Sequence, residues 1–275
     1  MKEFLQKAKE SSRVVATLST AIKNRTLLEF ADAIEENSCF IIEENIKDMK
    51  LAKQLDLSSA MQDRLYLNDS RIQDMANAIR QIASQTEPVG RVLDGWLTKD
   101  NLNIQKVSIP IGVIAIIYES RPNVTSDTAA LCFKSGNVCV LKGGKEAENS
   151  NKAIAKIIQD VLEKNNLPKE IVSLLPDSSR EGVAKLIVED KYVDLIVPRG
   201  GEALIKFITQ NSSIPVIKHD KGVCHTFIDK DANATKSINI VINAKCQRPS
   251  ACNSLETLLI HEDIASYILP GIQEE

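Results

Sequence analysis

Hydrophobic residues recur at intervals of three and four through residues 1–90, and charged residues fill most positions between them. One such run joins Val14, Leu18 and Ile22. Because a helix brings residues three and four apart onto one face, this pattern predicts a block of amphipathic helices. A proline and a glycine near residue 90 end the block.

Two short stretches with imperfect alternation follow, at residues 91–97 and 101–107, on either side of Lys99 and Asp100. This pattern predicts a β-hairpin. A protruding hairpin is either an ordinary surface feature or a contact between subunits, and the pattern alone leaves both open.

From residue 109 the pattern changes to short β-branched runs that alternate with amphipathic segments. Continuous apolar runs are typical of parallel strands buried on both faces. We expect strands at 112–118, 137–142, 171–175, 193–197, 215–217 and 225–228, and helices at 128–134, 150–164, 182–188 and 202–209. Strand–helix repetition of this kind predicts an α/β fold with a doubly wound parallel sheet.

A helix at 234–244, a polar loop at 245–254, a strand at 256–261 and a last helical start predict a second α/β layer. We therefore expect a dinucleotide-type domain from 1–90 and 109–228, a hairpin at 91–108, and the first, incomplete part of another domain at 229–275. On this interpretation the chain is truncated.

Composition narrows the function classes. Hydrophobic residues make up 43% of the 275 residues and charged residues 26%, which excludes general disorder and collagen-like repeats. A net charge of −3 and 4% aromatic residues favour neither a nucleic-acid partner nor a membrane surface. No membrane span or signal peptide is expected. Six cysteines without a CxxC pair indicate reduced cytoplasmic thiols, and we expect no metal site.

Two strand–Gly-Gly turns carry cations where strands end, at the sheet edge that binds ligands in open α/β folds. A helix that starts after such a turn favours phosphate groups through its free N–H groups. Neither a GxGxxG motif nor a P-loop is present, and an ordinary tight turn is the alternative in each case. The residues are Lys142, Gly143, Gly144, Lys145, Arg199, Gly200 and Gly201.

Cys252 is a candidate nucleophile because it lies in a polar loop between a helix and a strand. A thiolate needs cations or N–H groups nearby, whereas a structural cysteine does not. Cys246 is the competitor in the same loop. The polar neighbours of Cys252 are Lys245, Arg248, Ser250 and Asn253.

Four stretches together resemble the γ-glutamyl phosphate reductase family of the aldehyde dehydrogenase superfamily: 109–147, 194–201, 222–225 and 243–261. The resemblance covers nearly the whole chain. It implies an aldehyde dehydrogenase-type Rossmann-like fold and NADPH-dependent reduction of γ-glutamyl 5-phosphate to glutamate-5-semialdehyde and phosphate in proline biosynthesis. The implied route is a cysteine thioacyl intermediate. It also implies a homo-oligomer for the full-length protein, a functional link to glutamate 5-kinase, and relatives about half as long again.

The same resemblance assigns the nucleophile to Cys252, because Leu258 and Leu259 then occupy the paired apolar positions of the following strand. Cys246 does not fit that register. Where hydrolytic relatives carry a water-activating Glu, this chain has Lys218-His219, which suits transfer of the acyl group to phosphate. Where relatives that prefer NAD carry a Glu, it has Lys145, which favours NADP(H).

The superfamily's oxyanion Asn has no clear equivalent: Asn123 is the nearest candidate, although Glu119 falls closer by spacing. His225 is expected to be a structural hydrogen-bonding residue. Two alternatives stay open, a hydrolysing NAD(P)-linked aldehyde dehydrogenase and a non-catalytic dinucleotide-binding fragment, and low turnover is expected of an incomplete chain. Implied substrate-binding residues are Arg121, Asn123, Arg248, Ser250 and Asn253.

Overall fold

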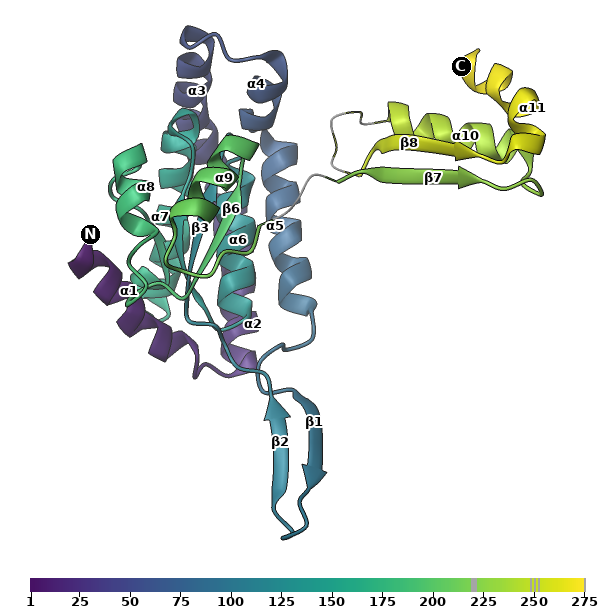
Figure 1. The fold of residues 1–275 in the computed structure, drawn as a ribbon. Helices are drawn as coiled ribbons and strands as arrows, with labels where there is room; N and C mark the ends of the chain where they lie inside the picture. Colours follow the sequence, from purple (N-terminus) through teal and green to yellow (C-terminus); the bar gives the residue numbers. More distant parts are fainter. Residues whose placement is uncertain (219–221, 248, 250, 252, 275) are drawn as a thin grey trace. The chain divides into compact units, whose positions relative to one another are not determined.

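The computed structural model describes residues 1–218, 222–247, 249, 251 and 253–274. The chain divides into two compact units, Met1–Lys218 and His219–Glu275, and each is described by itself (Figure 1). The expected start of a second unit is thus present, but the division falls at residue 218 rather than 228.

A four-stranded parallel sheet in the order β5-β4-β3-β6 forms the centre of the first unit. Strand β3 is buried along its whole length, as its unbroken apolar sequence predicts. A single bridge from Ile196 to Val216 extends the sheet beyond β6, where a full short strand was expected. The strands are β3 (Val113–Tyr118), β4 (Val138–Lys142), β5 (Val172–Leu174) and β6 (Leu195–Arg199).

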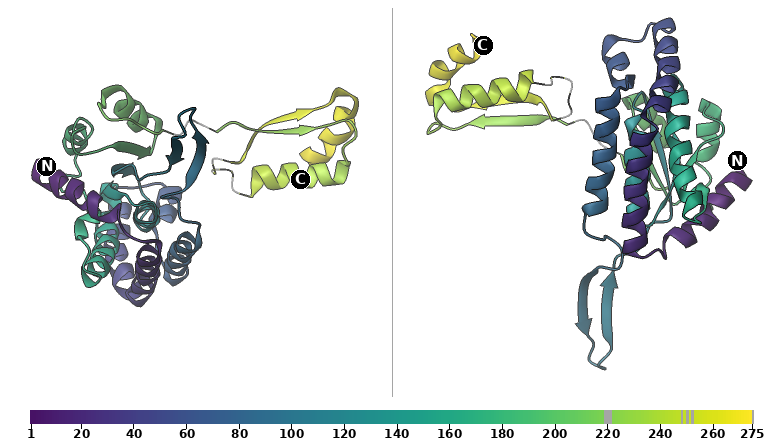
Figure 2. Two further views of the ribbon diagram at one scale, coloured as in Figure 1. Left: turned by 90° about the horizontal axis from the view of Figure 1, so that it is seen from below. Right: turned by 180° about the vertical axis from the view of Figure 1, so that it is seen from behind.

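Helices cover both faces of this sheet, so the predicted doubly wound architecture is confirmed. The view from below in Figure 2 shows α8 and α9 on one side of the strands and α6 and α7 on the other. Helix α1 packs directly on β3 and β4. The helices are α1 (Lys2–Val15), α6 (Asn123–Lys134), α7 (Glu148–Lys164), α8 (Arg180–Leu186) and α9 (Glu202–Asn211), with short 3-10 turns at Lys145–Ala147 and Lys169–Ile171.

The predicted N-terminal helical block forms a third layer outside α6 and α7. Helix α2 packs against α5 and α7, and α3 packs against α7 (Figure 2). Side-chain oxygens of Ser19, Ser58 and Asn68 cap three of these helices, which explains where they begin. The block comprises α2 (Thr20–Glu36), α3 (Ser38–Gln54), α4 (Ser59–Leu65) and α5 (Asp69–Ser84).

Buried polar contacts join this outer layer to the sheet module. The Lys23 ammonium donates to the Lys134 carbonyl at 3.1 Å and to the Glu87 carboxylate at 2.5 Å. Within the sheet module itself, the partly exposed Lys9 ammonium of α1 donates to Asp194 at 2.7 Å. The layers of this unit are therefore held by specific contacts as well as by apolar burial.

Strands β1 (Val92–Leu97) and β2 (Asn103–Val107) form the predicted antiparallel hairpin, which projects away from the sheet (Figure 1). Every residue of both strands is exposed. Trp96 and Leu97 expose 53% and 68% of their surface, so this hairpin carries uncovered apolar side chains on both faces.

In the second unit β7 (Cys224–Ile228) and β8 (Leu255–Ile260) form a two-stranded parallel sheet. Helices α10 (Ala234–Cys246) and α11 (Glu262–Gln273) pack around Ile228, Val241, Leu255 and Ile268. The pairing of β7 with β8 is the reason for the earlier boundary, because it removes residues 224–228 from the sheet of the first unit.

Several helix boundaries differ from expectation, and two of the differences concern candidate residues. Helix α6 begins at Asn123 rather than Thr128, because Pro122 already has helical φ and ψ at the position before it. Helix α10 continues to Cys246, so that thiol ends a helix instead of lying in the loop.

Candidate functional site

Three of the expected segments meet at the carboxyl edge of the four-stranded sheet. Strand β3 lies between β4 and β6, with Ile117 opposite Lys142 and Tyr118 opposite Arg199. The loops that follow the three strands therefore start side by side. The two Gly-Gly turns, some 55 residues apart in the sequence, are brought together by this register.

Gly143 and Gly144 form a turn in which side chains are excluded by close neighbours. A Cβ on Gly143 would overlap the amide nitrogen of Asn151, and one on Gly144 would overlap the carboxylate of Glu146. Neither glycine has a positive φ, so steric space rather than backbone conformation requires glycine here. Gly143 remains partly exposed in this turn, whereas Gly144 is buried.

A buried hydrogen-bonded chain supports the Gly143 turn from below. The Thr125 hydroxyl donates to Asn151 Oδ1 at 2.9 Å and contacts the Tyr118 hydroxyl at 2.7 Å. All three side chains are buried, and burial raises the pKa of Tyr118 while the hydrogen bond to Thr125 opposes the shift. Tyr118 thus stays a neutral phenol that fixes the turn.

Cations and carboxylates alternate around this edge. Lys142 is half-buried, while Lys145 and Arg199 are exposed. Burial lowers the pKa of Lys142, the carboxylates of Glu146 and Glu119 oppose that shift, and Lys145 adds to it. These groups therefore interact electrostatically and form one cluster.

The helix that follows each Gly-Gly turn begins differently. The first amide groups of α7 are occupied by the buried carboxylate of Asp48, which accepts from Ser150 N–H at 2.8 Å and Asn149 N–H at 3.1 Å. The Ser150 hydroxyl donates to the same carboxylate at 2.6 Å. These amide groups at the start of α7 are therefore occupied by a protein side chain.

Helix α9 starts at Gly201 with more open surroundings, since a Cβ on Gly201 would meet no atom within 4 Å. Its one described side-chain contact is the Glu119 carboxylate, whose Oε2 accepts from the Gly201 N–H at 3.0 Å. The Gly200-Gly201 turn therefore differs from the Gly143-Gly144 turn: the side chain at the start of its helix is the exposed Glu119 carboxylate rather than a buried one.

Arg121 and Asn123 follow β3 at the same edge. Arg121 is exposed. Asn123 lies in the first turn of α6, where its amide donates to Asp127 at 3.0 Å. Burial raises the pKa of Asp127, and this hydrogen bond opposes the shift.

The remaining candidates belong to the second unit. Cys252, Arg248 and Ser250 lie outside the described residues. Asn253 is exposed. The Lys245 ammonium donates to the Leu255 carbonyl at 2.8 Å, so part of its hydrogen-bonding capacity ties α10 to β8.

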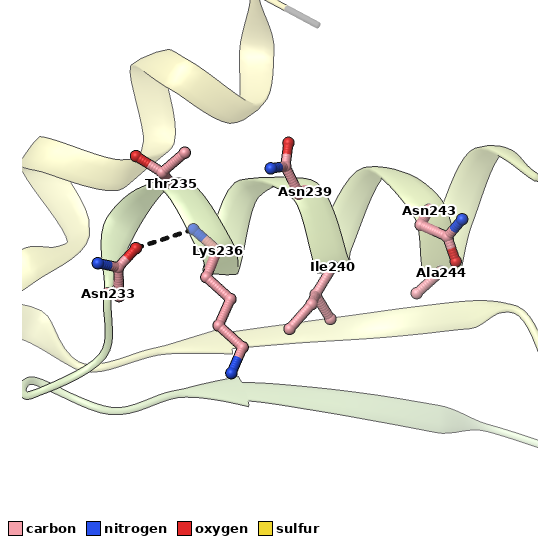
Figure 3. A pocket seen from close by; sticks show the side chains of 7 residues that line it. All are labelled: Asn233, Thr235, Lys236, Asn239, Ile240, Asn243 and Ala244. Atoms are coloured by element: carbon pink, nitrogen blue, oxygen red, sulfur yellow. Dashed lines mark hydrogen bonds between the residues drawn. The ribbon is translucent and has the colours of Figure 1, made fainter.

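His225 and the hollow beside α10 add no further chemistry. The His225 ring contacts the Val223 carbonyl through Nδ1 at 2.8 Å. Figure 3 shows the hollow, of about 540 Å³, along one helix face with three asparagines and a single cation. The dashed bond in it is the Asn233 cap on the Lys236 N–H. Its lining residues are Asn233, Thr235, Lys236, Asn239, Ile240, Asn243 and Ala244.

No group of three or more His, Cys, Asp or Glu residues in the described part of the chain is arranged to hold a metal ion. No helix there combines the length and apolar character needed to cross a bilayer.

Glu119 and Asp48 contribute most to this edge beyond the motifs. The sequence points to Glu119 only through its spacing, and nothing in it indicates the bond to Gly201. Asp48 carried no sequence signal, since its partners lie about 100 residues further along.

The sequence and the fold of this chain both match known proteins. Residues 1–275 match the model of the aldehyde dehydrogenase family. The chain is 73% identical over 274 residues to γ-glutamyl phosphate reductase of Aliarcobacter butzleri, covering 100% of this chain and 66% of that protein. It is 61% identical to that of Nautilia profundicola, of which it covers 67%.

A solved structure of a protein with the same name as these relatives has a similar fold. The crystal structure of γ-glutamyl phosphate reductase from Thermotoga maritima superposes with a TM-score of 0.94 at 40% identity, covering 99% of this chain and 66% of that one. Rhodopseudomonas palustris propionaldehyde dehydrogenase, at 15% identity and a TM-score of 0.70, shares the fold alone. The chain spans about two thirds of the length of the relatives it matches. The resemblance inferred from the motifs is confirmed.

Proposed function

We propose that this chain, which belongs to the aldehyde dehydrogenase family, forms the dinucleotide-binding and nucleophile-bearing part of a γ-glutamyl phosphate reductase. The proposed reaction converts γ-glutamyl 5-phosphate and NADPH into glutamate-5-semialdehyde, phosphate and NADP⁺. The observation that carries the proposal is the 73% identity to one such enzyme along the whole chain. A kinase that phosphorylates the glutamate side chain, glutamate 5-kinase, would supply the substrate.

The cofactor is assigned to the carboxyl edge of the first unit. The residues present there fit a dinucleotide phosphate: Gly143 is partly exposed, and no atom lies within 4 Å of a Cβ position on Gly201. Lys142, Lys145 and Arg199 supply positive charge. The residues proposed to hold it are Lys142, Gly143, Gly144, Lys145, Arg199, Gly200 and Gly201.

NADP(H) is proposed over NAD(H) because of the charge at this turn. Lys145 is exposed and would attract a 2′-phosphate, which a carboxylate would repel. The nearest carboxylate along the chain, that of Glu146, already accepts from Ser120 N–H at 2.7 Å and its hydroxyl at 2.5 Å. That engagement reduces its availability to bind ribose hydroxyls.

The nucleophile is proposed to be Cys252, on the strand register with Leu258 and Leu259. Its thiolate would attack the acyl carbon, a C–S bond would form, and the C–O bond to phosphate would break. The nicotinamide, when bound, supplies the hydride that reduces this carbon. Collapse of the reduced adduct would return the electron pair to sulfur and release the aldehyde.

Substrate anions need cationic partners in this scheme. Arg121 and Arg248 are proposed for the phosphate or the glutamyl carboxylate, since a guanidinium binds either through two parallel hydrogen bonds. Asn123, Ser250 and Asn253 are proposed as neutral donors. The Asn123 bond to Asp127 leaves its second amide hydrogen for this role.

The exposed hairpin β1–β2 is proposed as a contact between copies of the protein. Its support is the uncovered Trp96 and Leu97, since isolated two-stranded hairpins are marginal in water. Replacing both by lysine should lower the assembled mass measured by light scattering. An unchanged mass would exclude the hairpin from the interface.

An assay in the reverse direction tests the reaction. The protein is mixed with glutamate-5-semialdehyde, phosphate and NADP⁺, and NADPH formation is followed at 340 nm. Phosphate-dependent formation, lost in Cys252→Ser and retained in Cys246→Ser, is expected of the complete protein. Aldehyde oxidation that does not require phosphate would favour a hydrolysing aldehyde dehydrogenase. Dinucleotide binding by a verified complete protein without turnover would favour a non-catalytic binding module.

A further inference from the structure

The Glu119 carboxylate sits where the first amide group of α9 would meet an anion. Its Oε2 accepts from the Gly201 N–H at 3.0 Å. Gly201 is the residue before α9 and has no side chain with which to cap the helix itself. The carboxylate instead comes from the neighbouring strand, because Glu119 follows the Tyr118–Arg199 pair of the ladder.

The shape of the turn permits this contact and leaves it open to solvent. A Cβ on Gly200 would lie 2.8 Å from Cδ and Oε2 of Glu119, so glycine makes room for the carboxylate. Glu119 is exposed, and nothing lies within 4 Å of a Cβ position on Gly201. The buried Asp48 carboxylate at the start of α7 has no such freedom.

A phosphate that accepts from the Gly201 N–H competes with Glu119, because both anions need that donor and repel each other. Glu119 also interacts electrostatically with Lys142. Burial lowers the pKa of Lys142, and the Glu119 carboxylate is among the groups that oppose this shift. Displacement from Gly201 therefore does not leave it without a favourable partner.

We propose that Glu119 is an intramolecular competitor at the start of α9, which a phosphate group of the dinucleotide must displace in order to bind. The inference rests on the proposed dinucleotide site. Glu119 is thus a residue that limits cofactor affinity, and its carboxylate returns to Gly201 when the cofactor leaves.

Calorimetric titration of the 275-residue chain with NADP⁺ tests this. Glu119→Gln keeps the size and an acceptor oxygen but removes the charge, and should tighten binding about two- to fivefold. Glu119→Ala removes the acceptor as well and should tighten it at least as much. Glu202→Gln is the matched control: it removes the same charge from the first turn of α9, and no described hydrogen bond joins Glu202 to Gly201. Its effect should stay below twofold.

Unchanged or weaker binding in both Glu119 variants, with normal circular dichroism, would overturn the inference. An equal gain in Glu202→Gln would also overturn it, because net charge would then explain the effect. If the wild-type chain binds no dinucleotide, the proposed function fails, and pyrophosphate decides the inference. The Gly201 amide signal in an NMR titration should respond at lower pyrophosphate concentration in Glu119→Gln than in wild type. Identical responses would refute the competition.

Discussion

Replacing Gly143 by alanine should disrupt the turn between β4 and α7 through the buried chain beneath it. The new Cβ would overlap the Asn151 amide and lie 3.3 Å from the Tyr118 ring. Asn151 is 3% exposed and cannot swing into water without breaking its bond to Thr125. The perturbation is therefore steric, and the damage spreads to a hydrogen bond.

Two contributions set the magnitude. Leaving a buried donor without its partner costs about 1–3 kcal/mol. Forcing an extra methyl into a packed site costs about 1–3 kcal/mol. Against these, alanine reduces the freedom of the unfolded chain by about 0.4–1 kcal/mol. The free energy of unfolding of Gly143→Ala should thus fall by about 1–6 kcal/mol.

Urea unfolding followed by far-UV circular dichroism measures the loss, with Gly201→Ala as the matched control. Gly201 has open space at its Cβ position, so that variant should lose no more than about 1 kcal/mol. The decisive variant is Gly143→Ala combined with Asn151→Ala, which removes the overlapped group. Its loss should be smaller than the sum of the two single losses by at least about 1 kcal/mol. Additive losses would refute the proposed steric coupling.

Three further predictions concern charge and thiol chemistry. Lys145→Glu should lower the preference for NADP⁺ over NAD⁺ about tenfold in calorimetric titrations, since it reverses a charge near the 2′-phosphate; an unchanged ratio would contradict the cofactor assignment. In brief iodoacetamide labelling followed by peptide mapping, Cys252 should be alkylated fastest. Adding NADP⁺ should change the alkylation rate of Cys252 more than that of any other cysteine. The exposed Cys39 and Cys246 are its competitors, and a dominant Cys246 would move the nucleophile by six residues. Burial raises the pKa of Glu87, but hydrogen bonds from Lys23 and the Val89 N–H outweigh it, and the net shift is downward. The stability from this carboxylate is present above the ordinary glutamate pKa and lost as pH falls through the lower folded value, so Glu87→Gln should flatten the acid side of a urea-midpoint profile. A wild-type acid slope would contradict this.

The elements of the sheet were predictable because their signals are local. Residues 113–118 form an apolar, β-branched run that suits a strand buried on both faces, and this holds in β3. The two Gly-Gly turns were predictable for the same reason, since each follows such a run directly. Parallel strands then bring their carboxyl ends to one edge, which placed Lys142 and Arg199 near each other.

The local pattern of residues does not show which distant segment a strand or a polar side chain will contact. Residues 225–228 look like one more strand of the first sheet, but β7 pairs with β8 instead. Nothing in the local sequence shows that Asp48, on another helix, reaches the first amide groups of α7. For the same reason, the sequence did not indicate the contact between Glu119 and Gly201. Tertiary contacts of this kind depend on the folded arrangement, whereas the assignment of Cys252 remains a prediction from its register.

The long-range polar contacts of the first unit bear on how the chain emerges from the ribosome. Lys9, Lys23 and Asp48 are made early, but their partners lie 185, 111 and 102 residues later, at Asp194, Lys134 and Ser150. Until those segments are synthesised, the first helices carry polar groups without their partners, and the finished core buries two of them, Lys23 and Asp48. We therefore expect the nascent helical block to stay loosely collapsed and dependent on chaperones, and to become protease-resistant only after residue 194 has left the exit tunnel.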